Sequence, residues 1–330
     1  MIVASIIAAI IPAALYTGII YWVDRYEKEP LWLLATAFLW GAIPSIIFAL
    51  IFNEVFGFPF YVIFGAETGD ALVATLVAPF VEELIKAAVL FIILFWWRHQ
   101  IDSLLDGIIY GAVAGMGFAM VENVFYFEAV FAQEGIEGWQ ANIFLRAIIF
   151  GFNHSLYTAM SGLGIAIARL TKHRFWRIVA PIVGISLAMF LHFMHNGLAS
   201  FGYEFFGDAL LVPLLFNAWG GVSLTVLIII GTLWQERRWI RSYLKEEVSA
   251  GVLTESQFSV VSSNLGRFGK NWQMLFSRGM GDYFKHKRFL SRCSKLAYLK
   301  HHQDWYHDAE SKARILELRK EIYMLSQSLI

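Results

Sequence analysis

Acidic, basic and imidazole side chains interrupt several apolar stretches of this sequence. Glu82 and Glu83 are adjacent inside one such stretch, and Lys86 follows one helical turn later. A charged side chain in the lipid hydrocarbon costs at least ~2.5–3.5 kcal/mol on insertion scales, so it is retained where partners or function compensate. The polar residues that lie deep within apolar stretches are Glu82, Glu83, Lys86, Glu122, Asn123, Asn153, His154, His192, His195 and Asn196.

Two kinds of hydrolytic chemistry fit carboxylates and imidazoles that are buried together. In one, His154, His192 and a carboxylate hold a divalent metal ion with an open position, and another glutamate is the base for the bound water. In the other, which needs no metal, Glu82 activates water directly while a histidine and Asn196 stabilise the oxyanion. Ser-His-Asp and Cys-His mechanisms are not supported, because no such serine set stands out and Cys293 lies outside the apolar stretches.

The composition is that of a membrane protein. Of the 330 residues, 58% are hydrophobic and 16% are charged, whereas a soluble domain averages about 25% charged residues. A bilayer is crossed by about 20 apolar residues in a helix. The expected fold is therefore an all-α polytopic membrane helix bundle of about seven transmembrane helices. The seven apolar runs lie near residues 2–22, 31–52, 71–97, 104–127, 142–168, 176–200 and 208–234.

Charge is distributed unevenly along the chain. Residues 1–235 carry 9 Lys and Arg against 16 Asp and Glu, a net charge of −7, and residues 236–330 carry 17 against 10, a net charge of +7. Lys or Arg follows runs 1, 3, 5 and 7, whereas the other loops contain neither, and Arg146 near the start of run 5 is the exception. By the positive-inside rule, the N-terminus is expected outside and the C-terminus in the cytoplasm. Two domains are expected, a transmembrane domain over 1–235 and a cytoplasmic helical tail over 236–330.

The expected topology puts four of the polar residues at one depth, each on a different helix. At 1.5 Å of rise per residue, they lie roughly 9–18 Å below the outer surface. Scattered polar residues have no reason to agree in depth, so we expect a single shared site. The four residues are Glu82, Glu122, His154 and His192.

Residue spacing within the helices supports this site. His192, His195 and Asn196 have the spacing of neighbours on one helix face, and His195 is expected to be a neighbour of the site rather than a ligand. Glycines recur at every fourth position over residues 107–115. This pattern lets helices approach closely, so we expect it to hold the site together.

The order and spacing of these residues resemble the motifs of the PrsW family of intramembrane proteases. A segment just after the first apolar run, residues 24–30, resembles the DRYExEP signature of that family, and residues 106–119 resemble a further motif. The resemblance covers residues 16–200 and leaves the tail uncovered. The other matching motifs are Glu82-Glu83-x-x-Lys86, Phe118-x-x-x-Glu122-Asn123, His154 followed by Gly162, and His192-x-x-x-Asn196.

The resemblance implies cleavage of a single-pass membrane protein, typically an anti-sigma factor, near or within its membrane span. It also implies a multi-pass protein of the bacterial inner membrane, with the substrate and the lipid bilayer as partners and no nucleic acid. The family belongs to a wider group that includes the CAAX prenyl proteases, and the second motif of those proteases ends in His where this chain has Glu122. That group is described both as metalloproteases and as glutamic proteases. A divalent metal, with zinc as the first candidate, and a metal-free mechanism therefore both stay open.

We predict from these observations an intramembrane endopeptidase. A proton-coupled transporter is the main alternative, because proton relays also use buried acids and histidines. A non-catalytic scaffold that retains membrane partners is the third possibility. The predicted roles are Glu82 as the water-activating base, Glu83 as its support, Glu122, His154 and His192 as the metal-binding or polarising set, and Asn196 as the oxyanion donor.

Overall fold

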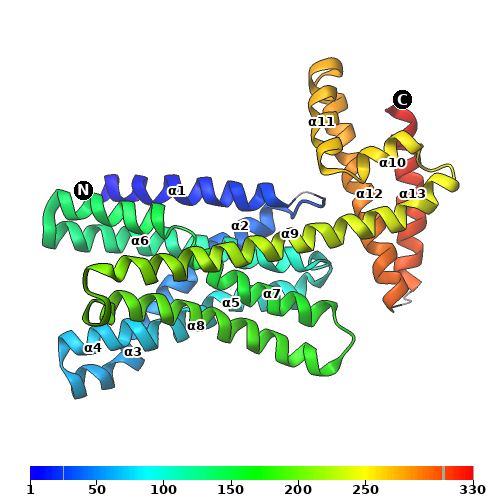
Figure 1. The fold of residues 1–330 in the computed structure, drawn as a ribbon. Helices are drawn as coiled ribbons and strands as arrows, with labels where there is room; N and C mark the ends of the chain where they lie inside the picture. The colour runs from blue at the N-terminus through cyan, green and yellow to red at the C-terminus, as the bar shows by residue number, and fades with distance from the viewer. Residues whose placement is uncertain (25, 307–308, 330) are drawn as a thin grey trace. The chain divides into compact units, whose positions relative to one another are not determined.

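Every regular element that the structure describes is a helix. The computed structural model describes residues 1–24, 26–306 and 309–329, so Arg25 of the loop signature lies outside the described residues. The all-α prediction is confirmed for this part of the chain (Figure 1). The helices are α1 (Ile2–Val23), α2 (Leu31–Trp40), α3 (Ile46–Phe64), α4 (Ala66–Leu72), α5 (Ala78–Trp96), α6 (Leu104–Ile143), α7 (Asn153–Leu170), α8 (Arg174–Phe206), α9 (Leu211–Ser249), α10 (Glu255–Val261), α11 (Asn264–Arg278), α12 (Met280–Tyr306) and α13 (Ala309–Ser328).

Short π-helical segments join several helices without a break. Gly41–Ser45 connects α2 to α3, Val73–Val77 connects α4 to α5, and Phe144–Ile149 follows α6. Pro44 lies inside the first of these segments, where its missing N–H disturbs the regular hydrogen-bond ladder. The helix that begins at Leu31 therefore continues to Phe64, beyond the predicted end of the second run near residue 52.

The chain forms two compact units. The first comprises Met1–Val23 and Glu29–Ile229, and the second comprises Asp24–Lys28 and Ile230–Ile330. The division falls within α9, whose 39 residues begin in the first unit and end in the second.

Four helical stretches of the described residues are long and apolar enough to cross a membrane. Two of these stretches each contain two long helices, α6 with α7 and α8 with α9. The helix α5 is also strongly apolar, but it carries Glu82, Glu83 and Lys86. The chain is thus a membrane protein, and the count of seven spans stays a prediction. The four stretches are Ile2–Val23, Leu31–Phe64, Leu104–Leu170 and Arg174–Ser249.

Glycines bring α6 and α7 into close contact. A Cβ atom added at Gly107 would collide with the backbone of Gly162, and one added at Gly111 would collide with the backbone of Thr158. At Gly115 the colliding group is the backbone of His154. These pairs run antiparallel along the two helices, as close small-residue packing allows. The predicted packing role of these glycines is confirmed, and Gly115 determines how closely the His154 backbone approaches α6.

The helix α7 is also closely packed against α8. A Cβ atom at Gly164 would meet the backbone of Ala180, and one at Gly184 would meet the carbonyl oxygen of Met160. On another side of α6, a Cβ atom at Gly117 would meet the backbone of Phe38 in α2. The helices α6 and α7 therefore pack on each other and on several neighbours, α1 and α2 beside α6 and α8 beside α7, and small residues determine the spacing.

The helix α6 is longer than the predicted fourth run, which ends near residue 127. It reaches Ile143, with a kink at Gly135, whose φ is 71°. The extension contacts the beginning of α1, where Ser5 Oγ donates to Glu128 Oε1 at 2.6 Å and Trp139 Nε1 donates to Ser5 Oγ at 2.8 Å. These contacts are long-range pairings that the composition of the segment does not indicate.

The second unit has a helical core of its own. Residues from the end of α9 and from α10, α12 and α13 are buried together, among them Leu244, Val261, Cys293 and Ile322. Glu247 is buried between Lys300 Nζ at 2.9 Å and Arg319 Nη2 at 2.8 Å. Burial raises the pKa of Glu247, but hydrogen bonds from these two cations outweigh it and hold the pKa below its usual value.

Residues near the start of the chain belong to this unit. Arg267 is buried, and it donates from Nη1 to the backbone oxygen of Tyr26 at 3.1 Å and from Nη2 to Ser294 Oγ at 2.8 Å. Lys295 Nζ lies 3.2 Å from Glu27 Oε1. The first part of the loop between α1 and α2, Asp24–Lys28, is therefore part of the unit formed by the C-terminal helices.

Candidate active site

The helix α5 carries two adjacent carboxylates and the lysine that compensates them. Residues three and four apart on a helix are neighbours, so one ammonium group reaches both acids. Lys86 Nζ lies 3.2 Å from Glu82 Oε2 and 2.8 Å from Glu83 Oε1, and all three side chains are buried. The ammonium group also lies 3.7 Å from the centroid of the Phe118 ring, a cation–π contact.

The two carboxylates have different surroundings. Glu83 is fully buried and has three partners, since Thr158 Oγ1 donates to Oε2 at 3.0 Å and His192 Nδ1 lies 3.1 Å from Oε1. Its third partner is Lys86. Among the described residues, Glu82 accepts a hydrogen bond from Lys86 alone. Of the two, Glu82 has the greater capacity to take a new ligand.

His154, at the start of α7, connects Lys86 to Glu122. Its Nδ1 lies 3.1 Å from Lys86 Nζ, and its Nε2 lies 2.8 Å from Glu122 Oε2. An ammonium group only donates and a carboxylate only accepts. Nδ1 is therefore the accepting nitrogen of the ring, and Nε2 carries the proton that is directed at Glu122.

Arg146 also belongs to this cluster of Glu82, Glu83, Lys86, His154 and Glu122, although the sequence analysis did not predict it there. Its Nη2 lies 2.6 Å from Glu122 Oε2, and its Nε donates to Asn123 Oδ1 at 3.0 Å. The signal was visible, because Arg146 is the exception to the charge alternation of the loops. Arg146 is therefore explained by its contacts with Glu122 and Asn123 of α6, and not by the preference of Lys and Arg for cytoplasmic loops.

His192 on α8 packs beside His154. The two ring centroids are 5.0 Å apart, and His192 also stacks on Tyr157 at a centroid distance of 5.0 Å. His195, one turn further on, is turned to other partners, with Nδ1 3.2 Å from Asn153 Nδ2. His195 is thus a neighbour with its own contacts.

Asn196 contacts the segment that leads into α5. Its Nδ2 donates to the backbone oxygen of Ala74 at 2.8 Å. Ala74 lies in the π-helical segment Val73–Val77, where i→i+5 hydrogen bonds replace the regular α-helical ones. In this structure Asn196 therefore joins α8 to the entry of α5.

Three of these residues form a group that has the donors of a metal site. Glu82, His154 and His192 each offer a ligand atom, and these atoms all lie within 4.8 Å of one another. Two histidines and a glutamate are also a common protein ligand set of catalytic zinc, whose tetrahedral ligands are about 3.4 Å apart. The donor types therefore suit a divalent ion, but Lys86 Nζ lies beside Glu82 and His154.

The second nitrogen of each histidine has a carboxylate partner. Glu122 lies at Nε2 of His154 and Glu83 lies at Nδ1 of His192. Such outer carboxylates fix the tautomer and the orientation of metal-binding histidines. The metal-binding set predicted from the sequence contained Glu122, and not Glu82, beside His154 and His192. The structure puts Glu122 against His154 and Arg146, and it groups Glu82 with the two histidines.

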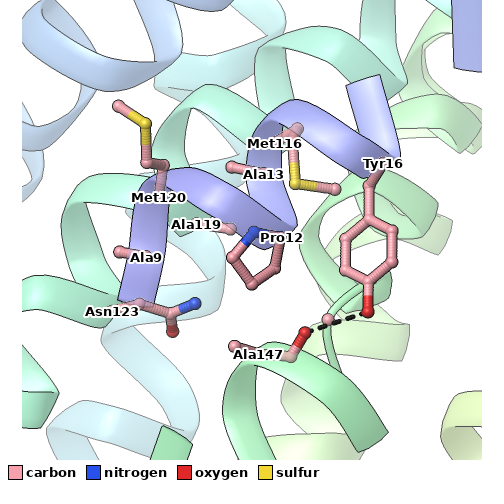
Figure 2. Close-up of a pocket in the computed structure, with 10 residues that line it drawn as sticks. Ala9, Pro12, Ala13, Tyr16, Met116, Ala119, Met120, Asn123 and Ala147 are labelled. Atoms are coloured by element: carbon pink, nitrogen blue, oxygen red, sulfur yellow. Dashed lines mark hydrogen bonds between the residues drawn. The ribbon is translucent and has the colours of Figure 1, made fainter. Parts of the chain in front are cut away.

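A small pocket lies beside this cluster, between α1 and α6. Figure 2 shows small side chains of both helices around it, and Tyr16 donates to the backbone oxygen of Ala147 at 3.0 Å. Asn123, which accepts from Arg146, contributes to the lining. The pocket thus reaches a residue that adjoins Glu122 in the sequence.

A cluster of glutamates and histidines within an apolar all-helical bundle is compatible with a hydrolase that acts in the membrane, because such side chains can hold a catalytic metal ion or activate water. Residues 29–230 match the family described as PrsW family intramembrane metalloprotease. The chain therefore belongs to the PrsW family, a family of peptidases that act within the membrane. The match ends at the residue where the second unit resumes, so the C-terminal helices lie outside it.

Individual relatives agree with this assignment. The chain is 28% identical to Protease PrsW of Bacillus subtilis over 173 residues, which are 52% of this chain and 72% of the relative. It is 29% identical to Protease PrsW of Geobacillus kaustophilus over 195 residues, 58% of this chain and 77% of the relative. It is 38% identical to Protease PrsW of Clostridioides difficile over 109 residues, 32% of this chain and 44% of the relative. No solved structure matches significantly.

Proposed function

We propose that this chain is an endopeptidase that cleaves a single-pass membrane protein, of the anti-sigma-factor type, near or within its membrane span. The observation that carries the proposal is the chain of contacts from Glu82 through Lys86 and His154 to Glu122, with Glu83 and His192 attached to it. Four helices contribute to this cluster, and an apolar bundle surrounds it. Family membership supports peptide hydrolysis as the reaction.

For the metal we propose Glu82, His154 and His192 as the ligands. The accepting nitrogen of His154 is Nδ1, and Nδ1 of His192 faces Glu83, which leaves Nε2 of that ring. A divalent ion held there, with zinc as our candidate, would polarise the scissile carbonyl and lower the pKa of a water molecule. Lys86 Nζ contacts Glu82 and His154, so binding of the ion requires the ammonium group to withdraw.

Glu122 is our candidate for the base in this arrangement. Its side chain is 16% exposed, compared with 6% for Glu82 and none for Glu83. Its contacts with Arg146 and His154 both use Oε2, which leaves Oε1 to accept a proton from water. Glu83 holds His192 in place, and Arg146 holds Glu122.

The metal-free alternative assigns the base to Glu82. Glu82 is the least engaged carboxylate of α5, and the adjacent Lys86 stabilises its ionised form. Asn196 is then the predicted oxyanion donor, which requires it to leave Ala74. Metal analysis of the purified protein decides between the two versions. Full activity after complete metal removal would eliminate the metal version.

We further propose seven membrane passes, with the N-terminus outside and the second unit in the cytoplasm of a bacterial cell, at the inner membrane. The helical course supports the count, because α1, α2–α3, α4–α5, α6, α7, α8 and α9 are seven helical stretches, and one pass for each would give seven. The relatives are proteins of bacteria. The net charge of +7 over residues 236–330 agrees with a cytoplasmic position.

Co-expression with tagged single-pass membrane proteins tests the function. Wild-type protein is expected to produce a shortened fragment of one substrate, and Glu82→Gln is expected to leave that substrate intact. Asn142→Gln, a substitution elsewhere in the bundle, is the expression control. A fragment that appears equally with Glu82→Gln would contradict the proposal. A carrier would instead show pH-dependent flux without any cleaved product.

A further inference from the structure

The helix α11 of the second unit has an exposed aromatic stripe. Leu265, Phe268, Trp272 and Phe276 are 84%, 52%, 46% and 80% exposed. At 100° per residue these four side chains fall within about 80° of the helix circumference. They therefore form one narrow apolar face, which we call the α11 stripe. Aromatic residues gathered in this way are unlike the singly scattered apolar residues of an ordinary surface.

A different face of α11 attaches the helix to its own unit. Arg267 and Met274 are buried, and Asn271 Oδ1 lies 2.7 Å from Nδ1 of His286 in α12. By the same helical count, Arg267 and Met274 are on the side of α11 opposite the stripe, and Asn271 is at its flank. The stripe is thus presented outward by a helix whose orientation is already determined by buried contacts.

Basic residues are frequent in the part of the sequence that contains the stripe. Residues 264–295 contain eight Lys and Arg and one acid, Asp282, so this segment has a net charge of +7. Arg278, Lys285, Lys287 and Arg288 are exposed. A helix with an apolar aromatic face and neighbouring cations has the composition of a helix that lies in the membrane interface. Polybasic segments are attracted to anionic headgroups in the same way.

Length and connectivity also favour a lipid surface. With 15 residues α11 is too short to span a bilayer, so a membrane-bound α11 must lie parallel to the surface. The second unit, which contains α11, is connected to the first unit by the continuous helix α9. A covalent connection keeps the local concentration of the bilayer high, so a weak surface affinity is sufficient.

We propose that α11 binds the surface of an anionic bilayer, with the α11 stripe inserted at the headgroup–acyl boundary and the surrounding Lys and Arg at the phosphates. The binding is independent of peptide hydrolysis, because none of these residues belongs to the candidate active site. It attaches to the membrane a unit that also contains Asp24–Lys28 of the loop between α1 and α2.

Site-specific fluorescence in the full-length protein tests this proposal. The single native cysteine, Cys293, is fully buried, so an environment-sensitive thiol probe can be directed to an introduced cysteine. Phe276→Cys reports on the stripe, and Ser277→Cys reports on the exposed polar side of the same helix turn. Each variant is reconstituted as single copies in nanodiscs of phosphatidylcholine, with or without phosphatidylglycerol, and with a quencher attached to the lipid chains.

The expected result is a blue-shifted probe at position 276 that lipid-attached quenchers quench several-fold more than the probe at position 277. This difference should increase with phosphatidylglycerol and decrease at high salt. The difference in quenching should be smaller in the double variant Lys285→Gln/Lys287→Gln. Cys293 should stay unreactive toward the thiol probe in this variant, which shows that the unit remains folded. Equal quenching at both positions in anionic nanodiscs would overturn the proposal. A blue shift that lipid-attached quenchers do not affect would also overturn it, since a protein would then cover the stripe.

Discussion

Lys86 contacts both the acidic side chains and a histidine of the candidate site. It compensates Glu82 and Glu83, and its ammonium group contacts His154 Nδ1, one of the atoms that would bind a metal. A cation of the protein itself thus lies among groups that would hold a divalent ion. Removing one partner of a buried ion pair costs about 3–5 kcal/mol, because the other charge is left uncompensated.

Lys86→Met is therefore expected to lower the thermal stability of the metal-free protein and to raise its affinity for zinc. Zinc would restore the lost positive charge, so it should increase the melting temperature of Lys86→Met more than that of the wild type. The measurement is thermal unfolding in detergent, with chelator and then with increasing zinc. Lys172→Met, outside the cluster, is the matched control. Equal responses to zinc in all three proteins would exclude a metal at this position.

Arg146→Gln is expected to reduce the cleavage rate by about 10–100-fold, the usual cost of losing a group that orients a functional residue. The reason is that Arg146 orients Glu122 and Asn123, with Nη2 at 2.6 Å from Glu122 Oε2 and Nε at 3.0 Å from Asn123 Oδ1. Arg146→Lys should recover part of the rate, and the exposed Arg174→Gln should change little. Initial rates on one substrate provide the measurement. An unchanged rate in Arg146→Gln would show that Glu122 needs no such support.

Residue type and depth were sufficient to predict most of the cluster. Glu82, Glu122, His154 and His192 were expected together because the predicted topology puts them in one layer of the membrane, and the structure brings them together. Arg146 was not expected, because its charge was interpreted only as a topology signal. The contacts of Thr158 with Glu83 could not be predicted either, since a threonine in an apolar helix has no distinctive pattern.

At the scale of elements, the position of His154 depends on how closely α7 approaches α6. Gly115→Ala should destabilise the protein by about 1–3 kcal/mol, as overpacking does, and should reduce cleavage. The added Cβ atom would collide with the backbone of His154. Gly18→Ala in α1, where no atom lies within 4 Å of the new Cβ, is expected to be neutral or stabilising by up to ~1 kcal/mol. Unfolding and cleavage assays on both variants provide the comparison, and equal effects would contradict this packing argument.

The contact between α11 and α12 is expected to make the second unit sensitive to acid. Burial, with Lys270 and Arg267 nearby, lowers the pKa of His286 from 6.5 to about 4. The folded state thus binds fewer protons than the unfolded state between these values, so stability is complete above pH 6.5 and falls as the pH decreases toward 4. Limited proteolysis of this unit at pH 7.5 and at pH 5 measures the effect. His286→Gln should reduce the difference, and an undiminished difference would assign it to another group.

For the whole molecule, the sequence predicted the fold class and missed some connections. Apolar runs predicted the helices, and the charge asymmetry separated a membrane part from a basic tail. The assignment of Asp24–Lys28 to the C-terminal unit was not predictable. It depends on contacts such as Arg267 with Tyr26, between residues that are 241 positions apart. The extension of α6 to Ile143 depends in the same way on distant partners in α1.

Hydrolysis by the buried cluster is tested most directly in a purified system. Wild-type protein and Glu82→Gln are reconstituted with one single-pass membrane substrate in water enriched in oxygen-18, and the products are analysed by mass spectrometry. We predict a new carboxyl terminus near or within the span of the substrate, carrying one heavy oxygen, with wild-type protein only. Formation of the same labelled terminus by Glu82→Gln would contradict hydrolysis by this cluster. So would a substrate that is cleaved in cells expressing the wild-type protein but is left intact by the purified wild-type protein.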